Sequence, residues 1–256
     1  MRIIFFFLVL LTAQHGMCQD SLTQLVDKYA KENNFSGVVM VATDGKPDIL
    51  KAVGLANRET GKAMQTDSKF RIASMTKVFT AVLTMKLVEE GKLALDKPIS
   101  AYFPEYVGEG KDKVTLHHLL TYSSGIENIA DKLGMGPYQV QLSLDEYIGK
   151  YCSGPLVYLP GSESRYGNTE YILIQKIIEK VSGQSFEKNL TAHILGPLHL
   201  RNTGMYPTKN PPQNEVNSYT WDDSLKTLTP DEHYLPEMYF GAGGMYSTAE
   251  DLLAFD

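Results

Sequence analysis

The chain has 256 residues, of which 43% are hydrophobic and 21% charged, and its formal net charge is −6. This balance excludes a disordered or low-complexity chain, and the length suffices for one large domain or two small ones. An acidic chain without a basic run argues against nucleic acid as a partner.

The first residues have the pattern of an export signal. Arg2 supplies a positive charge, and residues 3–11 form an apolar run that is too short to span a bilayer core of about 30 Å. The small residues Gly16 and Cys18 precede the predicted cleavage site. We therefore predict a signal peptide at 1–18 and an exported protein, periplasmic or secreted, without a transmembrane segment after cleavage. A membrane anchor or a buried strand is the alternative interpretation.

The next predicted elements are an α-helix and a β-hairpin. Residues 19–34 carry apolar side chains at helical spacing. Strand-like runs follow at 37–43 and 47–55, and Asp44-Gly45 between them is a hairpin turn signal. A helix beside an antiparallel hairpin indicates an α+β layer.

The strongest predicted helix covers residues 70–91 and ends at Gly91. It is apolar nearly all round, which predicts burial on every side. A helix-rich subdomain is predicted for roughly residues 93–240, including an amphipathic helix at 169–181. Within it, the Pro- and Asn-rich residues 206–230 predict a long loop.

Two Ser-x-x-Lys pairs occur, Ser74 with Lys77 and Ser185 with Lys188. Residues three apart on a helix share one face, so the amine can take the proton that a serine nucleophile must lose. About one such pair is expected by chance, so context decides between them. Ser74 opens the buried helix, whose positive end favours an oxyanion and lowers the pKa of Lys77. The alternative is a helix N-cap followed by a solvated lysine, which suits Ser185 better.

One Tyr-x-Asn element, with Tyr166 and Asn168, lies between a Pro-Gly turn and the amphipathic helix. Such a position can project both side chains into a cleft. A phenol beside a cationic lysine has a lowered pKa, so Tyr166 is a candidate to carry the proton to a leaving group. Asn168 is a candidate to orient a substrate through its amide. The alternative is that both residues cap and pack the following helix.

Other catalytic signatures are absent from the sequence. It contains neither a Gly-x-Ser-x-Gly nucleophile elbow nor a His-Glu-x-x-His zinc motif. His117 and His118 are adjacent and point to different sides of a helix, which does not suit a shared metal ion. The glycine-rich residues 241–244 lack the Lys-Ser/Thr of a phosphate loop. We predict no metal and no cofactor.

Several segments recur together in the order and at the spacing of a known family. They are residues 70–77, 119–125, 160–168 and 243–248. Through them the chain resembles the serine beta-lactamase and penicillin-binding protein family, in the branch of class C beta-lactamases, DD-carboxypeptidases and related esterases. Ordered recurrence across nearly the whole chain is more specific than any single motif.

The resemblance implies a fold and a role for each candidate residue. It implies a beta-lactamase/transpeptidase-like α+β domain over residues 19–256, with an active site between an antiparallel-sheet α/β layer and the helical subdomain. The implied roles are acylated nucleophile for Ser74, proton acceptor for Lys77, general acid/base for Tyr166 and substrate-amide ligand for Asn168. No cofactor is implied.

One family motif, Lys/His-Thr/Ser-Gly on a strand, is not found. Residues 202–204 lack the cation, and residues 226–228 lack the glycine. In the family this strand follows the segment matched at 243–248, so the chain resembles the N-terminal part of a longer protein, without the last strands of the sheet. Because an oxyanion donor is worth roughly 3–4 kcal/mol, we expect this chain alone to be poorly active or inactive.

The leading hypothesis is an exported, monomeric serine hydrolase. It would form a serine acyl-enzyme with a small-molecule or peptide substrate, which can be a beta-lactam, a D-alanyl peptide, an ester or an amide. The alternative is a non-catalytic extracellular binding module that keeps the fold without turnover. The missing motif favours that module, whereas intact Ser74, Lys77 and Tyr166 disfavour it.

Overall fold

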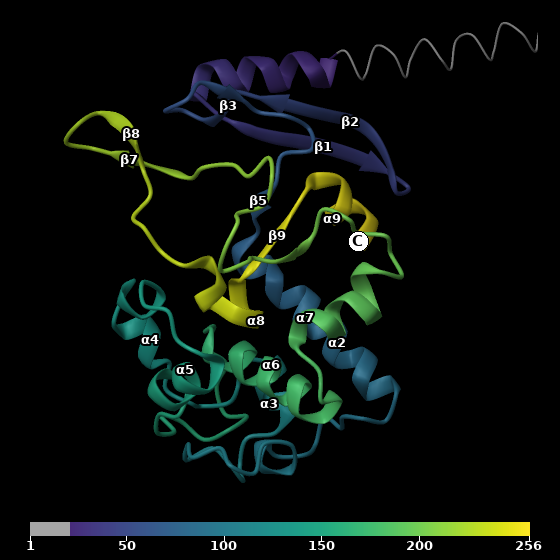
Figure 1. The fold of residues 1–256 in the computed structure, drawn as a ribbon, viewed down its shortest axis with the longest axis vertical. Coiled ribbons are helices and arrows are strands. Elements are labelled where there is room, and N and C mark those ends of the chain that lie inside the picture. The colour runs from purple at the N-terminus through teal and green to yellow at the C-terminus, as the bar shows by residue number, and fades with distance from the viewer. Residues whose placement is uncertain (1–20) are drawn as a thin grey trace, which may run out of the picture. The chain divides into compact units, whose positions relative to one another are not determined.

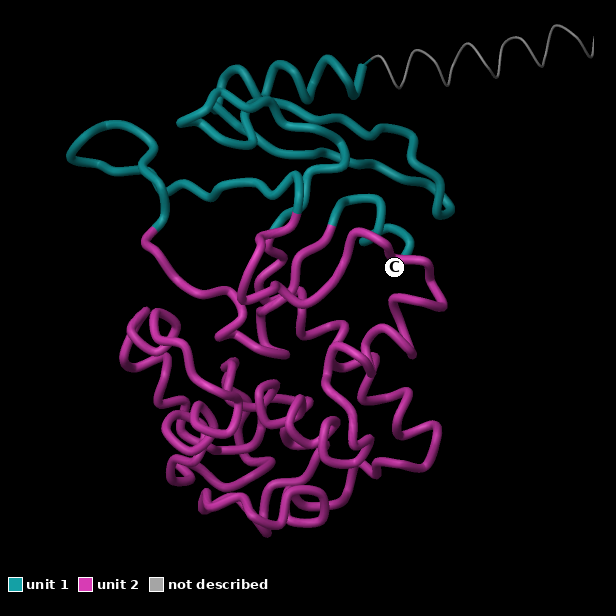
Figure 2. Tube along the Cα trace, viewed as in Figure 1, with its two compact units in different colours: residues 1–70, 213–231, 248–256 teal, residues 71–212, 232–247 magenta. Residues whose placement is uncertain are grey.

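The computed structural model describes residues 21–256 (Figure 1). The signal peptide predicted at 1–18, with Arg2 and its cleavage site, lies outside the described residues. Within 21–256, none of the helices combines the length and the apolar character needed to cross a bilayer. The chain divides into two compact units (Figure 2): residues up to 70, 213–231 and 248–256 form unit 1, and residues 71–212 and 232–247 form unit 2.

Unit 1 begins with a helix at residues 21–33, followed by the antiparallel hairpin of β1 (Gly37–Thr43) and β2 (Lys46–Val53). Asp44 and Gly45 form the two-residue turn, with φ of 50° and 71°. Positive φ at both central residues matches the twist of the flanking strands, and Asp-Gly adopts it readily. The predicted helix and hairpin are therefore confirmed.

A second hairpin lies in unit 1, where the sequence predicted only a long loop at 206–230. It is formed by β7 (Tyr219–Asp222) and β8 (Thr227–Pro230). The loop prediction was wrong here because four-residue strands rich in Thr and aromatic residues are too short to stand out from the polar residues around them. The remaining elements of unit 1 are β3 (Leu55–Asn57), β4 (Lys62–Ala63) and α9 (Ala249–Phe255).

Unit 2 holds most of the helices and a small three-stranded sheet. The strand order is β5 (Phe70–Arg71), β9 (Met245–Ser247) and β6 (Gly204–Met205), and Arg71 of β5 is the first residue of the unit. The α-helices are α2 (Thr76–Glu89), α3 (Leu116–Leu120), α4 (Ile129–Lys132), α5 (Leu144–Tyr151), α6 (Thr169–Ser182), α7 (Phe186–Leu190) and α8 (Phe240–Gly243). Short 3₁₀ turns cover Ala73–Met75, Ile99–Ala101, Gly136–Tyr138 and Pro236–Tyr239, and a π-helical turn covers Thr191–Leu195.

The core of unit 2 is built on α2 and α6. Apolar side chains from these helices are fully buried together with aromatic and aliphatic groups of α3, α5 and α7. The amphipathic pattern predicted for 169–181 is confirmed, because α6 buries its isoleucines and begins at Thr169. The largest fully buried side chains of the two central helices are Phe79, Leu83, Leu87, Ile172, Leu173 and Ile174.

The segment 70–91 is not one helix, as the sequence predicted. Phe70–Arg71 is a strand, Ala73–Met75 is a 3₁₀ turn, and α2 starts only at Thr76. The predicted end is confirmed: Gly91 has φ of 70°, its N–H donates to the carbonyl of Val88, and that of Lys92 donates to the carbonyl of Leu87. These two bonds form a Schellman motif, which needs a residue with positive φ.

One face of α2 is exposed, in contrast to the predicted burial on every side. Met75, Val78, Val82 and Met85 lie on this face and are exposed. A helix that is apolar all round carries no periodicity to show which face is covered, so the sequence could not distinguish the two faces.

We predict that the two faces of α2 contribute very differently to stability. Leu83 is 0% exposed and Val78 is 54% exposed. Leu83→Ala should lower the free energy of unfolding by about 3 kcal/mol, since it removes buried methyl groups and leaves a cavity. Val78→Ala should change it by less than about 0.5 kcal/mol. Urea titrations followed by circular dichroism measure both, and equal losses would contradict the assignment of the faces.

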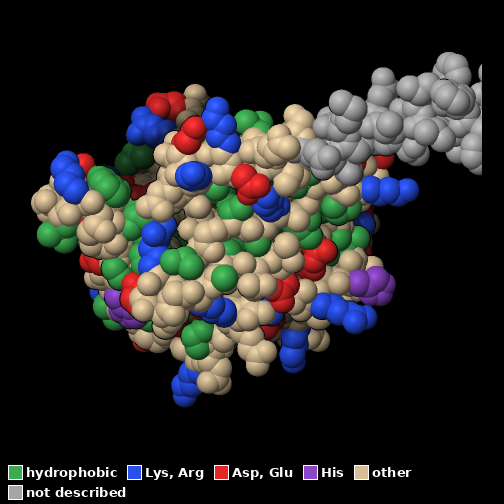
Figure 3. All heavy atoms as spheres, turned by 90° about the horizontal axis from the view of Figure 1, so that it is seen from above, with side chains coloured by type: hydrophobic (Ala, Val, Ile, Leu, Met, Phe, Trp, Pro, Cys, Tyr) green, Lys and Arg blue, Asp and Glu red, His purple; other side chains and the backbone are tan. Residues whose placement is uncertain are grey.

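Charged side chains of both signs are interspersed on the face of the molecule seen in Figure 3. Elsewhere in the described residues, ion pairs join Lys51 with Asp27, Lys86 with Glu89 and Lys176 with Asp145. The Lys86–Glu89 pair is exposed on both sides, and exposed ion pairs contribute little to stability.

Candidate active site

The candidate nucleophile, Ser74, follows a strained residue at the entry to α2. Ala73 has φ of 43°, in the left-handed region that non-glycine residues rarely adopt. Such strain costs about 1–3 kcal/mol and is concentrated at functional sites. The sharp turn from β5 leaves Ser74 exposed in the 3₁₀ turn directly before the helix.

Lys77 lies in the first turn of α2 and is only 3% exposed. Its Nζ donates a hydrogen bond of 3.1 Å to Ser74 Oγ. It also donates to Asn168 Oδ1 at 2.8 Å and to the backbone carbonyl of Ala242 at 2.8 Å. The structure therefore brings together three of the residues predicted from the sequence, from the 3₁₀ turn before α2, the first turn of α2 and the N-cap of α6.

These three partners determine the direction of the lone pair on Nζ of a neutral Lys77. An ammonium group has three N–H donors, and each partner can accept one of them. After loss of one proton, two N–H bonds and one lone pair remain. The carbonyl oxygens of Asn168 and Ala242 can only accept, so they retain the two N–H bonds. The lone pair then points to Ser74 Oγ, whose hydroxyl can donate.

Burial lowers the pKa of the Lys77 ammonium, because a buried charge loses its hydration. Interactions with Tyr166, Asp131 and Glu170 oppose this effect without reversing it. The direction agrees with the expectation from the sequence, and it increases the share of the neutral amine that can act as a base at neutral pH.

Tyr166 lies at the surface beside Lys77 and is 62% exposed. Lys77 Nζ lies 4.8 Å from the centroid of the Tyr166 ring. The Tyr166 ring also packs against Tyr122, and the centroids of the two rings are 5.0 Å apart. Tyr122 has φ of 57° and is a second strained residue at this site. Tyr166 is thus within reach of both the lysine and an incoming substrate.

The Asn168 side chain uses both ends of its amide. While Oδ1 accepts from Lys77, Nδ2 donates to Tyr138 Oη at 3.0 Å and lies 3.4 Å from Asp131 Oδ1. Tyr138 is buried and stacks on Tyr239, with ring centroids 3.8 Å apart. This rigid partner fixes the amide so that its oxygen faces Lys77.

The sequence reasoning missed several residues of the site. Asp131 and Tyr138 carry no motif, and Ala242 takes part only through its backbone carbonyl. The signal nearest to Ala242 was the glycine-rich run at 241–244, which overlaps the family segment at 243–248 but does not point to a backbone carbonyl. Burial raises the pKa of Asp131, and its hydrogen bonds with Tyr138 and Asn168 oppose this.

The second Ser-x-x-Lys pair has the structural role that its context indicated. Ser185 is the N-cap of α7, and its side chain accepts from the backbone N–H of Lys188 at 3.3 Å. As for metals, residues 21–256 contain no cluster of His, Cys, Asp and Glu side chains that could hold an ion.

A pocket of about 300 Å³ adjoins the site in unit 2. Tyr166, Gly167, Asp131 and Glu170 line it, together with apolar side chains such as Val157. Glu170 is buried and its Oε1 accepts from Ser124 Oγ at 2.8 Å. An exposed serine bonded to a buried lysine, beside a tyrosine and a pocket, can form and hydrolyse an acyl ester.

Comparisons with known proteins agree with this geometry. The family model described as Beta-lactamase matches residues 22–256. The chain is 30% identical over 266 residues to esterase EstB of Burkholderia gladioli, covering 91% of this chain and 67% of the esterase. It is 27% identical over 235 residues to the teichoic acid D-alanine hydrolase of Staphylococcus aureus strain MRSA252, covering 91% of this chain and 56% of that protein.

A solved structure shows the same fold. The octameric penicillin-binding protein homologue from Pyrococcus abyssi matches with a TM-score of 0.75 at 31% identity, covering 92% of this chain and 55% of that chain. The chain thus spans between about half and two thirds of the length of these three proteins. The predicted beta-lactamase/transpeptidase-like α+β fold and the resemblance are confirmed, and the chain belongs to the Beta-lactamase family.

Proposed function

We propose that this protein is an exported serine hydrolase that forms an acyl-enzyme on Ser74. The observation that supports it best is the 3.1 Å hydrogen bond between Lys77 Nζ and Ser74 Oγ. It joins an exposed hydroxyl to a buried amine of lowered pKa, which is the pairing that a serine nucleophile needs. The family and the activity in the name of the esterase relative are consistent with it.

The proposed reaction proceeds in two halves. Ser74 Oγ bonds to the carbonyl carbon of the substrate while its proton passes to Lys77 Nζ. The bond to the leaving group then breaks, and that group takes a proton from Tyr166, which Lys77 reprotonates. Water repeats these steps at the acyl ester and releases the acid, which restores Ser74. Asn168 would orient the substrate amide once its own amide hydrogen bonds rearrange.

The substrate class is an ester or amide with an accessible carbonyl, including beta-lactams and D-alanyl compounds. The relatives support this range, since their names include an esterase and a teichoic acid D-alanine hydrolase. Export is supported by the sequence pattern at 1–18, and we propose a periplasmic or secreted monomer.

Covalent labelling tests the proposal without requiring turnover. The purified chain is incubated with a fluorophosphonate, and the product is measured by intact mass and peptide mapping. We expect one phosphonyl group per chain, located on Ser74 in the tryptic peptide at residues 72–77. Heat-unfolded protein is the control and should remain unlabelled. No adduct on the folded chain, or an adduct on another serine, would favour the non-catalytic binding module.

A further inference from the structure

The backbone of α8 is held in place from two sides next to Lys77. The carbonyl of Gly241 accepts from Thr80 Oγ1 of α2 at 2.7 Å. The N–H of the same glycine donates to Gln175 Oε1 of α6 at 2.7 Å. The next carbonyl along the chain, that of Ala242, accepts from Lys77 Nζ. The contacts of Gly241 therefore decide where the Ala242 acceptor lies.

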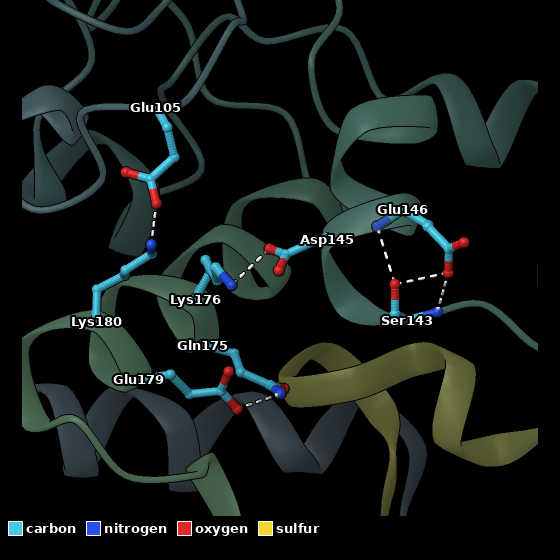
Figure 4. Close-up of polar contacts among 8 residues, drawn as sticks. All are labelled: Glu105, Ser143, Asp145, Glu146, Gln175, Lys176, Glu179 and Lys180. Atoms are coloured by element: carbon cyan, nitrogen blue, oxygen red, sulfur yellow. Dashed lines mark hydrogen bonds and ion pairs between the residues drawn. The ribbon is translucent and has the colours of Figure 1, made fainter.

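Gln175 is itself held by α6. It is 7% exposed, and its Nε2 donates to Glu179 Oε1 at 3.1 Å. Glu179 Oε1 also accepts the backbone N–H of Phe186 at 3.0 Å, which fixes the carboxylate. In Figure 4 the Gln175 side chain reaches from α6 to the start of α8, and a dashed line joins it to Glu179 beside it. The Gln175 amide is thus fixed at both ends.

The α8 segment needs such support because its own geometry is unfavourable. Phe240 has φ of 45°, a strained value for a bulky residue. The helix has only four residues, too few to be stable alone. At Gly241 an added Cβ would lie 3.2 Å from both Gln175 Cβ and the Tyr171 carbonyl, so the backbone already packs closely on α6.

We propose that Gln175 is a positioning residue of the active site, which holds the Gly241–Ala242 backbone so that Ala242 retains one N–H of Lys77 and the amine faces Ser74. Gln175 touches neither Ser74 nor Lys77 and acts through the α8 backbone. The catalytic part of this inference rests on the proposed function, whereas the effect on Lys77 does not.

Three variants separate positioning from general stability. Gln175→Met keeps the length of the side chain and removes its acceptor. The double variant Gln175→Glu with Glu179→Gln exchanges the two groups, keeps the net charge, and preserves an acceptor for Gly241 N–H. Lys176→Met is the matched control, because it removes the 2.5 Å ion pair with Asp145 from the adjacent position of α6, away from α8 (Figure 4).

Two readouts are measured across pH. The first is the titration of the Lys77 Cε resonance in protein labelled with ¹³C-lysine, assigned with Lys77→Met. The second is the rate of fluorophosphonate labelling. The ionisable groups that face Lys77 are Tyr166, Asp131 and Glu170, and none is altered in these variants.

Gln175→Met should move the Lys77 titration to lower pH, because the ammonium loses a well-placed acceptor. It should also slow labelling about tenfold at the high-pH plateau, because the lone pair no longer points steadily to Ser74. The exchanged double variant should restore both, and Lys176→Met should match the wild type. A merely structural role would change the amount of folded protein but not the Lys77 titration.

The inference is overturned if Gln175→Met titrates and labels like the wild type. It is also overturned if Lys176→Met produces the same shift, or if the double variant restores nothing. Should the wild-type chain not label at all, the proposed function fails, and the Lys77 titration in the three variants still decides whether Gln175 positions the amine.

Discussion

Ser74→Ala is expected to abolish covalent labelling of the chain by fluorophosphonate and penicillin probes. The variant removes the hydroxyl that accepts from Lys77 Nζ, and no acyl or phosphonyl bond can form at this position. Any measurable turnover should fall by about 10⁴- to 10⁶-fold, as when other serine hydrolases lose their nucleophile. Intact mass after incubation with probe measures the first effect, and initial rates with an ester substrate measure the second.

Ser185→Ala is the matched control for this variant. Ser185 has the same Ser-x-x-Lys spacing, but it caps α7. Its loss should leave labelling unchanged and lower the free energy of unfolding by about 1 kcal/mol, since an N-cap is lost. Full labelling of Ser74→Ala together with loss of labelling in Ser185→Ala would reverse our assignment of the two motifs.

Lys77→Met is expected to slow acylation by about 10³-fold, because it removes the proposed general base and keeps a similar side-chain volume. The variant should remain folded, since Met fills the buried site of Lys77 without the cost of a buried charge. Single-turnover labelling rates measure the loss. Lys188→Met is the control, and it should label like the wild type because only the backbone of Lys188 contacts Ser185.

The pH dependence of acylation provides a second measurement on Lys77. Only the neutral amine can accept the serine proton, so the rate should rise as pH increases through the pKa of Lys77. Because burial lowers that pKa, the rise should be centred below the ordinary lysine value of about 10.4. In Lys77→Met this limb should disappear. A rise with pH that persists in Lys77→Met would show that Lys77 is not the group that accepts the serine proton.

Local sequence chemistry was sufficient for much of the fold. Asp44-Gly45 determined a two-residue hairpin, Gly91 determined the end of α2, and the apolar spacing after Asn168 determined α6. Each of these features depends on the conformational preference of one or two residues, or on a periodicity within one helix. The start of α2 could not be predicted this way, because the strained turn at Ala73 is imposed by the surrounding structure.

The candidate site was predictable where side chains carry the chemistry. Ser74 and Lys77 are close by their three-residue spacing, across the 3₁₀ turn and the first turn of α2. The family segments pointed to Tyr166 and Asn168. Ala242 and Gln175 could not be predicted from the sequence, since a backbone carbonyl has no sequence signal and a buried glutamine has no motif. Their roles exist only because α2, α6 and α8 meet in unit 2.

By itself, the sequence determined the β1–β2 hairpin, the end of α2 and the course of α6. Through the ordered segments it also indicated the family. Only the tertiary structure decided which face of α2 is covered and which acceptors surround Lys77. The physical reason is that burial and the direction of a lone pair depend on atoms distant in the chain. Ser74 and Lys77 are neighbours at the start of α2, but the acceptors of Lys77 are Asn168 and the Ala242 carbonyl, whose place we assign to Gln175.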